Sequence, residues 1–181
     1  MKRSGSMPTT YPTKHSTQFV HRGAHGVLDV FGPTVEFLTL PEEPDTDYCV
    51  MIGTIPPGVS VPLHSHPDPE SFYVLSGSVR TLDQRGDTLQ WRTVNPGEFA
   101  HIPGHAKHAW QNASSEPSIQ LITTTRRLGG FFREIGRPVN AGSPGKPPTA
   151  DDLQHLIRIA AKYEYWMGSP EENAALGIVI K

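Results

Sequence analysis

Residues 58–77 read GVSVPLHSHPDPESFYVLSG, and this stretch decides how the rest of the chain is interpreted. His64 and His66 are two residues apart, and side chains at that spacing on a β-strand point to the same face. A Pro-Asp-Pro turn follows, and Glu70 then begins a second strand-like run that can return its carboxylate toward the two imidazoles. The pattern predicts that these three side chains converge on one point.

A second window, residues 97–112, reads GEFAHIPGHAKHAWQN and can supply a third imidazole. Three neutral imidazoles and one carboxylate suit a divalent transition metal ion such as Fe, Mn, Co, Ni, Cu or Zn. A structural zinc site would normally be closed and rich in cysteine, whereas Cys49 is the one cysteine of this chain. We therefore expect an open site, with one or two positions left for water, substrate or dioxygen.

On both sides of these two windows, and within them, the sequence predicts a series of short strands. The runs are rich in Val, Ile, Thr, Phe and Tyr, and Pro, Gly, Asp and Asn separate them, which is typical of an all-β sandwich or barrel. The predicted strands are Val27–Phe31, Val35–Leu40, Tyr48–Ile55, Val61–His66, Ser71–Leu82, Thr88–Val94, Glu98–Ile102, His108–Asn112 and Ile119–Thr125. Type II turns, with Pro first and Gly second, are predicted at residues 57–58, 96–97 and 103–104.

The two ends of the chain differ in composition from the middle. We predict a flexible N-terminus over residues 1–16, a barrel over 17–139, and a linker with a C-terminal helical tail over 140–181. Thr149 and Asp152 resemble a capping box that opens a helix, which we expect to end at Gly168. Ser169 and Pro170 form a second helix start. About 40 residues make too small a core alone, so the tail is predicted to pack on the barrel as a lid or brace.

Composition narrows the classes of function. The net charge is −2 and no basic stripe occurs, which argues against a nucleic-acid partner. No run approaches the roughly 18 apolar residues of a membrane span, and the N-terminus lacks the apolar region of a secretory signal. We therefore expect a cytoplasmic protein without a membrane partner. Cys49 lies in an apolar run and is predicted to be a buried small hydrophobe.

Strand alternation also predicts the walls of a pocket. Phe72 and Val74 share a face with Glu70, and Trp110 shares one with His108. An apolar, aromatic cavity beside a metal ion would suit a flat aromatic or hydrophobic small molecule. The alternative for each of these residues is an ordinary place in the core. His105 lies on the turn before His108 and is a candidate for the pocket mouth or for proton transfer.

These windows resemble the two motifs of the cupin family. The first motif, G-x5-H-x-H-x3-E-x6-G, is matched by Gly58, His64, His66, Glu70 and Gly77. The second, G-x5-P-x-G-x2-H-x3-N, is matched by Gly97, Pro103, His108 and Asn112. His105 stands where the family has a second glycine, and Gly104 lies one place upstream. The resemblance therefore does not extend to the geometry of this turn. The resemblance implies a double-stranded β-helix, or jelly-roll, barrel and adds His108 to the metal ligands His64, His66 and Glu70.

Residues 123–135, TTTRRLGGFFREI, extend the resemblance to single-domain cupins related to quercetin 2,3-dioxygenase. That resemblance implies a homodimer, one metal ion, and a Glu70 that is both ligand and catalytic base. The leading hypothesis is therefore a metal-dependent dioxygenase acting on a small aromatic or enolisable substrate. Two alternatives stay open, namely a non-oxidative metal-dependent lyase or isomerase and a small-molecule-binding cupin without turnover.

Overall fold

A computed structural model describes residues 17–43, 46–86, 88–139 and 147–179. The predicted flexible segment 1–16 and most of the predicted linker lie outside the described residues. The strands are β1 (Leu28–Asp29), β2 (Thr34–Phe37), β3 (Tyr48–Ile55), β4 (Ser60–Ser65), β5 (Glu70–Ser76), β6 (Val79–Arg85), β7 (Thr88–Val94), β8 (Phe99–Ile102), β9 (His108–Gln111), β10 (Ser118–Thr125), β11 (Arg137–Pro138) and β12 (Trp166–Met167). The helices are α1 (Arg126–Ile135), α2 (Ala150–Lys162) and α3 (Pro170–Ala175).

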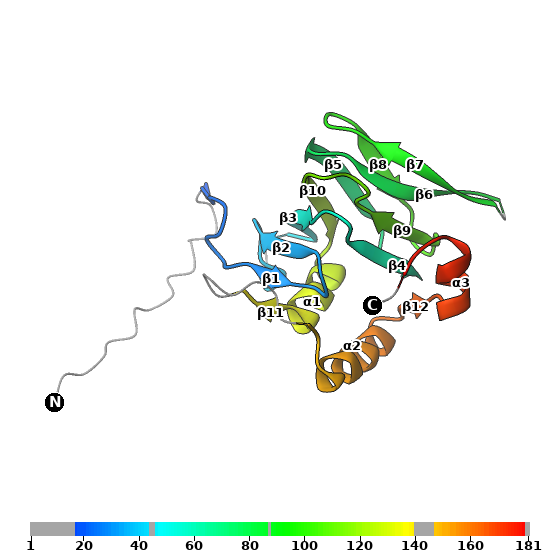
Figure 1. Cartoon of the computed structure of the whole chain (residues 1–181). Helices are drawn as coiled ribbons and strands as arrows, with labels where there is room; N and C mark the ends of the chain where they lie inside the picture. Colours follow the sequence, from blue (N-terminus) through cyan, green and yellow to red (C-terminus); the bar gives the residue numbers. More distant parts are fainter. Residues whose placement is uncertain (1–16, 44–45, 87, 140–146, 180–181) are drawn as a thin grey trace.

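The strands form two antiparallel sheets, which confirms the predicted all-β jelly-roll class (Figure 1). The larger sheet has the order β11-β1-β2-β3-β10-β5-β8, and the smaller has the order β12-β4-β9-β6-β7. Among the described residues no strand of one sheet pairs with a strand of the other, so the jelly roll consists of two facing sheets that do not close into one continuous sheet. The sheets are instead held together by side chains.

Gly77 is the point where the chain passes from the larger sheet to the smaller. The predicted single strand Ser71–Leu82 is divided there into β5 and β6. Gly77 has φ +66°, and a Cβ added to it would lie 2.3 Å from the Pro117 carbonyl oxygen. Only glycine combines that backbone conformation with such a close approach, so this motif position is explained by chain geometry.

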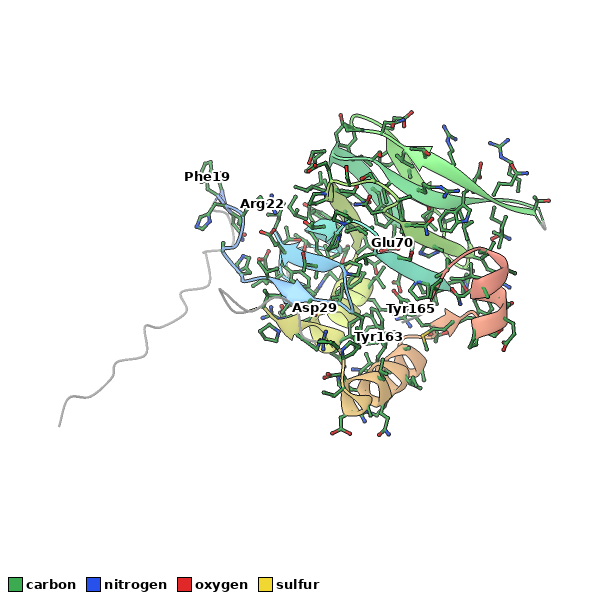
Figure 2. All side chains as sticks on the ribbon, viewed as in Figure 1. Phe19, Arg22, Asp29, Glu70, Tyr163 and Tyr165 are labelled. Carbon is green, nitrogen blue, oxygen red and sulfur yellow. The ribbon has the colours of Figure 1, made fainter. Side chains whose placement is uncertain are left out.

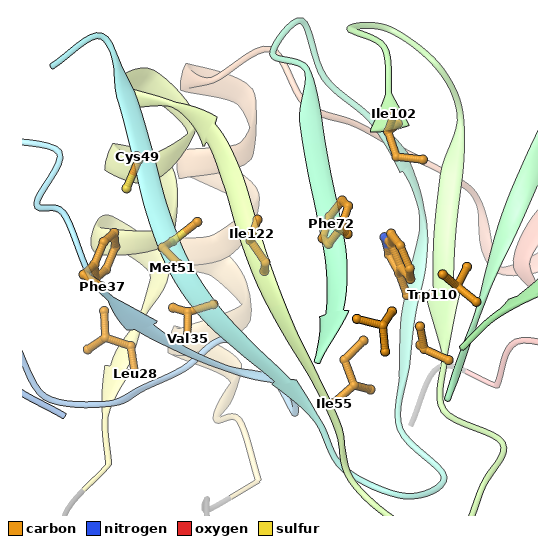
Figure 3. Packing of buried hydrophobic residues seen from close by; sticks show 13 residues of the cluster. Leu28, Val35, Phe37, Cys49, Met51, Ile55, Phe72, Ile102, Trp110 and Ile122 are labelled. Carbon is orange, nitrogen blue, oxygen red and sulfur yellow. The ribbon is translucent and has the colours of Figure 1, made fainter. Parts of the chain in front are cut away.

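The main core lies between the sheets and follows the predicted alternation along β5. Phe72 and Val74 are buried, whereas Tyr73 and Leu75 point outward and are exposed. Figure 3 shows Phe72 facing Trp110 across the gap between the sheets, with Ile122 beside it on the neighbouring strand. Cys49 is fully buried, as predicted, and its thiol donates a weak hydrogen bond to the Thr39 carbonyl oxygen.

Two of the three predicted Pro-Gly turns have a glycine in the left-handed region, with φ +72° at Gly58 and +87° at Gly97. The third prediction is wrong, because the positive φ there, 66°, belongs to His105. Gly104 is required for a different reason, since a Cβ at that position would lie 2.1 Å from the Pro67 carbonyl oxygen. The shifted glycine of the second motif therefore lets this turn pack against the turn that follows His66.

Helix α1 was not predicted as a helix. Thr125 caps its N-terminus, and Leu128, Phe131 and Ile135 are buried on one face. The Gly-Gly pair allows close packing, because a Cβ on Gly129 would lie 2.7 Å from the Cys49 sulfur. Two glycines give the segment low intrinsic helix propensity, so tertiary contacts stabilise this helix.

The C-terminal tail runs along both the helical layer and the smaller sheet (Figure 1). Helix α2 begins with the predicted Thr149–Asp152 capping box, but it ends at Lys162 and not at Gly168. Glu164 reverses the chain with φ 57°, and β12 then pairs with β4. Ser169 caps α3 as predicted. No helix in the described part of the chain has the length and apolar character needed to cross a lipid bilayer.

Asn173 ties this tail to β4, and its replacement by alanine should destabilise the protein. The side chain is fully buried, its oxygen accepts from the Leu63 amide at 2.8 Å, and its nitrogen donates to two carbonyls at 3.0 Å. Asn173→Ala leaves the Leu63 amide unpaired, so we expect a loss of about 1–3 kcal/mol in the free energy of unfolding. Urea denaturation measures it. Asn95→Ala, at an exposed position, serves as the control, and an equal effect of the two changes would contradict the assignment.

Candidate metal centre

The four predicted ligands converge on one point from both sheets. His64 lies on β4 directly opposite His108 on β9, and His66 follows at the end of β4. Glu70 opens β5 and approaches from the larger sheet, near the middle of the molecule (Figure 2). One ligand atom from each of the four side chains lies within 4.8 Å of all the others. The cluster therefore brings together the residues that the spacing and the two motifs predicted.

Backbone contacts orient two of the imidazoles. His64 Nδ1 lies 2.7 Å from the Pro62 carbonyl oxygen, and His108 Nδ1 lies 2.9 Å from that of Ala106. A carbonyl can only accept, so each Nδ1 carries a proton, and Nε2 is the ring atom that can bind a metal ion once it is deprotonated. Among the described residues, both nitrogens of His66 and Nε2 of His108 are buried without a hydrogen-bond partner, and Glu70 Oε2 lies 3.3 Å from each Nε2. Buried imidazole nitrogens without hydrogen bonds fit a divalent cation, which they would bind as ligands.

The protonation states also suit a cation. Burial lowers the pKa of His64 well below its usual value, and the nearby His108 adds to this effect. For Glu70, burial alone would raise the pKa, but His108 and His66, whose Nε2 atoms lie 3.3 Å from Oε2, lower it to about 2. The site therefore holds an ionised carboxylate next to a neutral imidazole at neutral pH, and metal binding requires both forms.

A buried aspartate fixes the turn that joins His66 to Glu70. Asp68 accepts hydrogen bonds from the Thr125 hydroxyl and from Arg127, both at 2.5 Å. Arg127 also contacts Glu164 of the tail at 3.0 Å. These contacts hold the ligand-bearing turn against the start of α1 and link it to the tail. Sequence reasoning missed the role of Asp68, although its place between two prolines was visible.

Tyr165 covers the imidazoles from the tail side. Its ring is nearly parallel to that of His64, with centroids 5.6 Å apart, and it lies 4.6 Å from that of His66. On its other side it stacks on Phe131 at 4.2 Å. Figure 2 shows Tyr165 between Glu70 and the helical layer. Burial raises the pKa of this phenol well above its usual value. No pattern in the sequence pointed to Tyr165.

A cavity of about 880 Å³ leads away from the cluster. Glu70 and His64 line it, together with the predicted pocket residues Phe72 and Trp110, whose rings are 4.3 Å apart. Val74 is fully buried in the core and is not among the lining residues. His105 is exposed and lies along a separate surface depression on the outside of the molecule. The tail lines part of the cavity, notably at Tyr165.

Comparison with known proteins agrees with this architecture. The family described as Cupin domain matches residues 51–124, which span the whole two-window region and the strands around it. The chain contains a cupin domain. Quercetin 2,3-dioxygenase of Bacillus subtilis is 28% identical over 95 residues, which are 52% of this cupin and 27% of that protein. This cupin thus spans about a quarter of the length of the curated relative it matches.

A solved structure with a TM-score of 0.50 shows the same fold. A single-residue variant of B. subtilis oxalate decarboxylase superposes with a TM-score of 0.50 at 18% identity, covering 63% of this cupin and 32% of that chain. The Cupin_2 domain of an XRE family transcriptional regulator from Enterobacter cloacae has a TM-score of 0.43 at 24% identity, covering 52% of this cupin and 96% of that chain. At these identities the likeness concerns the fold alone.

Proposed function

We propose that this cupin is a metal-dependent dioxygenase that acts on a small aromatic or enolisable organic substrate. The observation that carries the proposal is a cluster of three imidazoles and one carboxylate, of which His64 and Glu70 line an apolar cavity with aromatic walls. The partial likeness to a quercetin 2,3-dioxygenase supports the choice of substrate class.

Each residue of the site has a definite part in this proposal. His64, His66 and His108 hold the metal ion, and Glu70 is the fourth ligand. A divalent ion bound there would act as Lewis acid and as template for an oxyanionic substrate. Phe72 and Trp110 contact the flat body of the substrate, and Tyr165 keeps water away from the imidazoles on the tail side.

Glu70 is also the proposed base for the substrate hydroxyl. A carboxylate with a pKa near 2 holds a proton weakly, so in this environment the ligand role is the stronger of the two. General-base catalysis requires the carboxylate to lie within hydrogen-bond reach of the substrate proton, at about 2.6–3.2 Å. The position of Glu70 supports this role, because it lines the cavity and belongs to the cluster of candidate ligands.

Oxygen consumption tests the proposal. Protein loaded separately with Fe, Mn, Co, Ni, Cu or Zn is mixed with 3-hydroxyflavone, a flat aromatic enol, and oxygen uptake is followed with an electrode. We expect uptake with at least one metal and none after chelation. Conversion of the flavonol without oxygen uptake would favour a lyase or isomerase, and binding without conversion would favour a passive binder. Either result would contradict the dioxygenase proposal.

We also propose that the chain forms a homodimer through the outer face of the larger sheet. Tyr73, Leu75 and Phe99 are 42%, 47% and 63% exposed, and Tyr73 lies opposite Phe99 on the edge strand β8. An apolar face at a sheet edge is commonly hidden by pairing.

Phe99→Lys should therefore shift the protein from dimer to monomer at micromolar concentration, as measured by light scattering. Ile157→Lys, an exposed apolar position on α2, should leave the dimer intact. A monomeric wild-type protein would remove the claim.

A further inference from the structure

Two polar side chains in the cavity wall have no part in the metal cluster. Gln120 on β10 and Trp110 on β9 are 2% and 3% exposed. Within the part of the chain that the structure describes, the amide oxygen of Gln120 and the indole Nε1 of Trp110 are buried without a hydrogen-bond partner, and both residues line the cavity. An acceptor and a donor are therefore unpaired in the space that leads away from Glu70.

Counting residues along each strand gives the distance of each group from the level of its nearest candidate ligand. On β10, Thr124 pairs with Glu70, Ile122 with Phe72 and Gln120 with Val74. Gln120 thus lies four residues along the wall from the level of Glu70, which corresponds to roughly 13 Å at about 3.3 Å per residue. Trp110 lies two residues beyond His108, or roughly 7 Å along the opposite wall.

The Gln120 side chain is not explained by the core. Its amide nitrogen lies 3.4 Å from the Ser118 hydroxyl, a long contact, and no group among the described residues pairs with its oxygen. Turning the amide over would leave its nitrogen unpaired instead, so one of its polar atoms faces the cavity in either orientation. A buried polar group without a partner costs folding free energy, and leucine would fill nearly the same volume without that cost. Such a group is expected where a ligand supplies the partner.

We propose that Gln120 and Trp110 are specificity-determining residues that anchor the far part of the substrate. This inference rests on the proposed function and extends it to the shape of the ligand. The ligand is an elongated, flat molecule whose oxyanionic end lies at Glu70 and whose aromatic body lies against Phe72. Near its middle the ligand has an acceptor that receives a hydrogen bond from Trp110 Nε1–H. At its far end it has a hydroxyl that hydrogen-bonds to the Gln120 amide.

Two flavonols that differ by one hydroxyl test the anchor. In 3-hydroxyflavone the end remote from the metal-binding enol is a bare phenyl ring, whereas 3,4′-dihydroxyflavone carries a hydroxyl there. Binding to metal-loaded protein is titrated under anaerobic conditions by the visible absorption of the flavonol. We expect the wild type to bind the dihydroxy compound about ten-fold more tightly, and Gln120→Leu to abolish that difference without weakening 3-hydroxyflavone. Trp110→Phe should weaken both compounds, because both contain the midway ring oxygen, while the metal content stays the same.

Urea unfolding without ligand distinguishes a Gln120 that anchors substrate from a Gln120 that stabilises the fold. In metal-free protein, Gln120→Leu should leave the urea midpoint of unfolding unchanged or raise it, whereas a structural glutamine would lower it. Gln90→Leu, at an exposed position on β7, is the control. A lowered midpoint, or equal affinities of the wild type for the two flavonols, would overturn this inference and leave the dioxygenase proposal standing. Failure of the wild type to bind either flavonol would contradict the proposed function and this inference together.

Discussion

Replacement of His66 by alanine is expected to lower the affinity for a divalent metal ion by about 100-fold or more. The loss of a group that merely supports a ligand already costs about 10–100-fold, and His66 is predicted to be a ligand itself. Within the described residues neither ring nitrogen has a hydrogen-bond partner, and the contact of Nε2 with Glu70 Oε2, at 3.3 Å, is longer than a usual hydrogen bond, so the metal-free protein gains little from the imidazole. His66→Ala should therefore fold normally and fail in metal binding.

Thermal unfolding with and without metal measures this effect. A ligand at 100 times its Kd stabilises the native state by about 2.7 kcal/mol, which raises Tm by roughly 5–11 °C in a chain of this size. We expect that rise for the wild type and for His101→Ala, which replaces an exposed histidine hydrogen-bonded to Ser71. His66→Ala should show almost none. A full metal-induced rise in His66→Ala would show that the ligand set is wrong.

Glu70→Gln is expected to depress turnover by about 10²–10⁴-fold, which is the usual contribution of general acid–base catalysis. Glutamine keeps the size of the side chain and one oxygen that can bind a metal ion, but it lacks the charge and the basicity. Metal content should therefore fall far less than turnover. Metal content and oxygen consumption are measured on the same sample.

The two roles of Glu70 give different results in this experiment. If Glu70 is only a ligand, turnover and metal content should decline together. Full activity in metal-loaded Glu70→Gln protein would remove the base assignment, while the three-histidine site would stand. Asp83→Asn is a suitable control, because this carboxylate pairs with Arg85 and does not belong to the cluster of candidate ligands.

The cluster of four candidate ligands was predictable because most of its geometry is local. His64 and His66 obey the two-residue period of a strand, and a three-residue turn suffices to bring Glu70 back to them. Alternation likewise predicted the buried face of β5. The motif resemblance was needed for His108, since residues 97–112 contain three histidines and spacing alone did not select one. The structure shows why the other two differ, because His101 and His105 are both exposed.

The tail was less predictable because its course depends on contacts between distant segments. The capping box at Thr149 is a local signal and was found, whereas the end of α2 is set at Glu164, whose residue type seldom takes a positive φ. Its carboxylate pairs with Arg127, which in turn holds Asp68 beside the ligands. That chain of contacts delivers Tyr165 to the imidazoles, and no single segment of sequence contains it.

Elemental analysis of the purified wild-type protein tests the central claim most directly. The protein is dialysed against each candidate metal in turn, freed of excess ion, and measured by mass spectrometry together with the protein concentration. The account predicts about one divalent transition metal ion per chain, lost in a variant that carries alanine at His64, His66 and His108. A wild-type protein that retains no more metal than this triple variant, with every candidate metal, would contradict it.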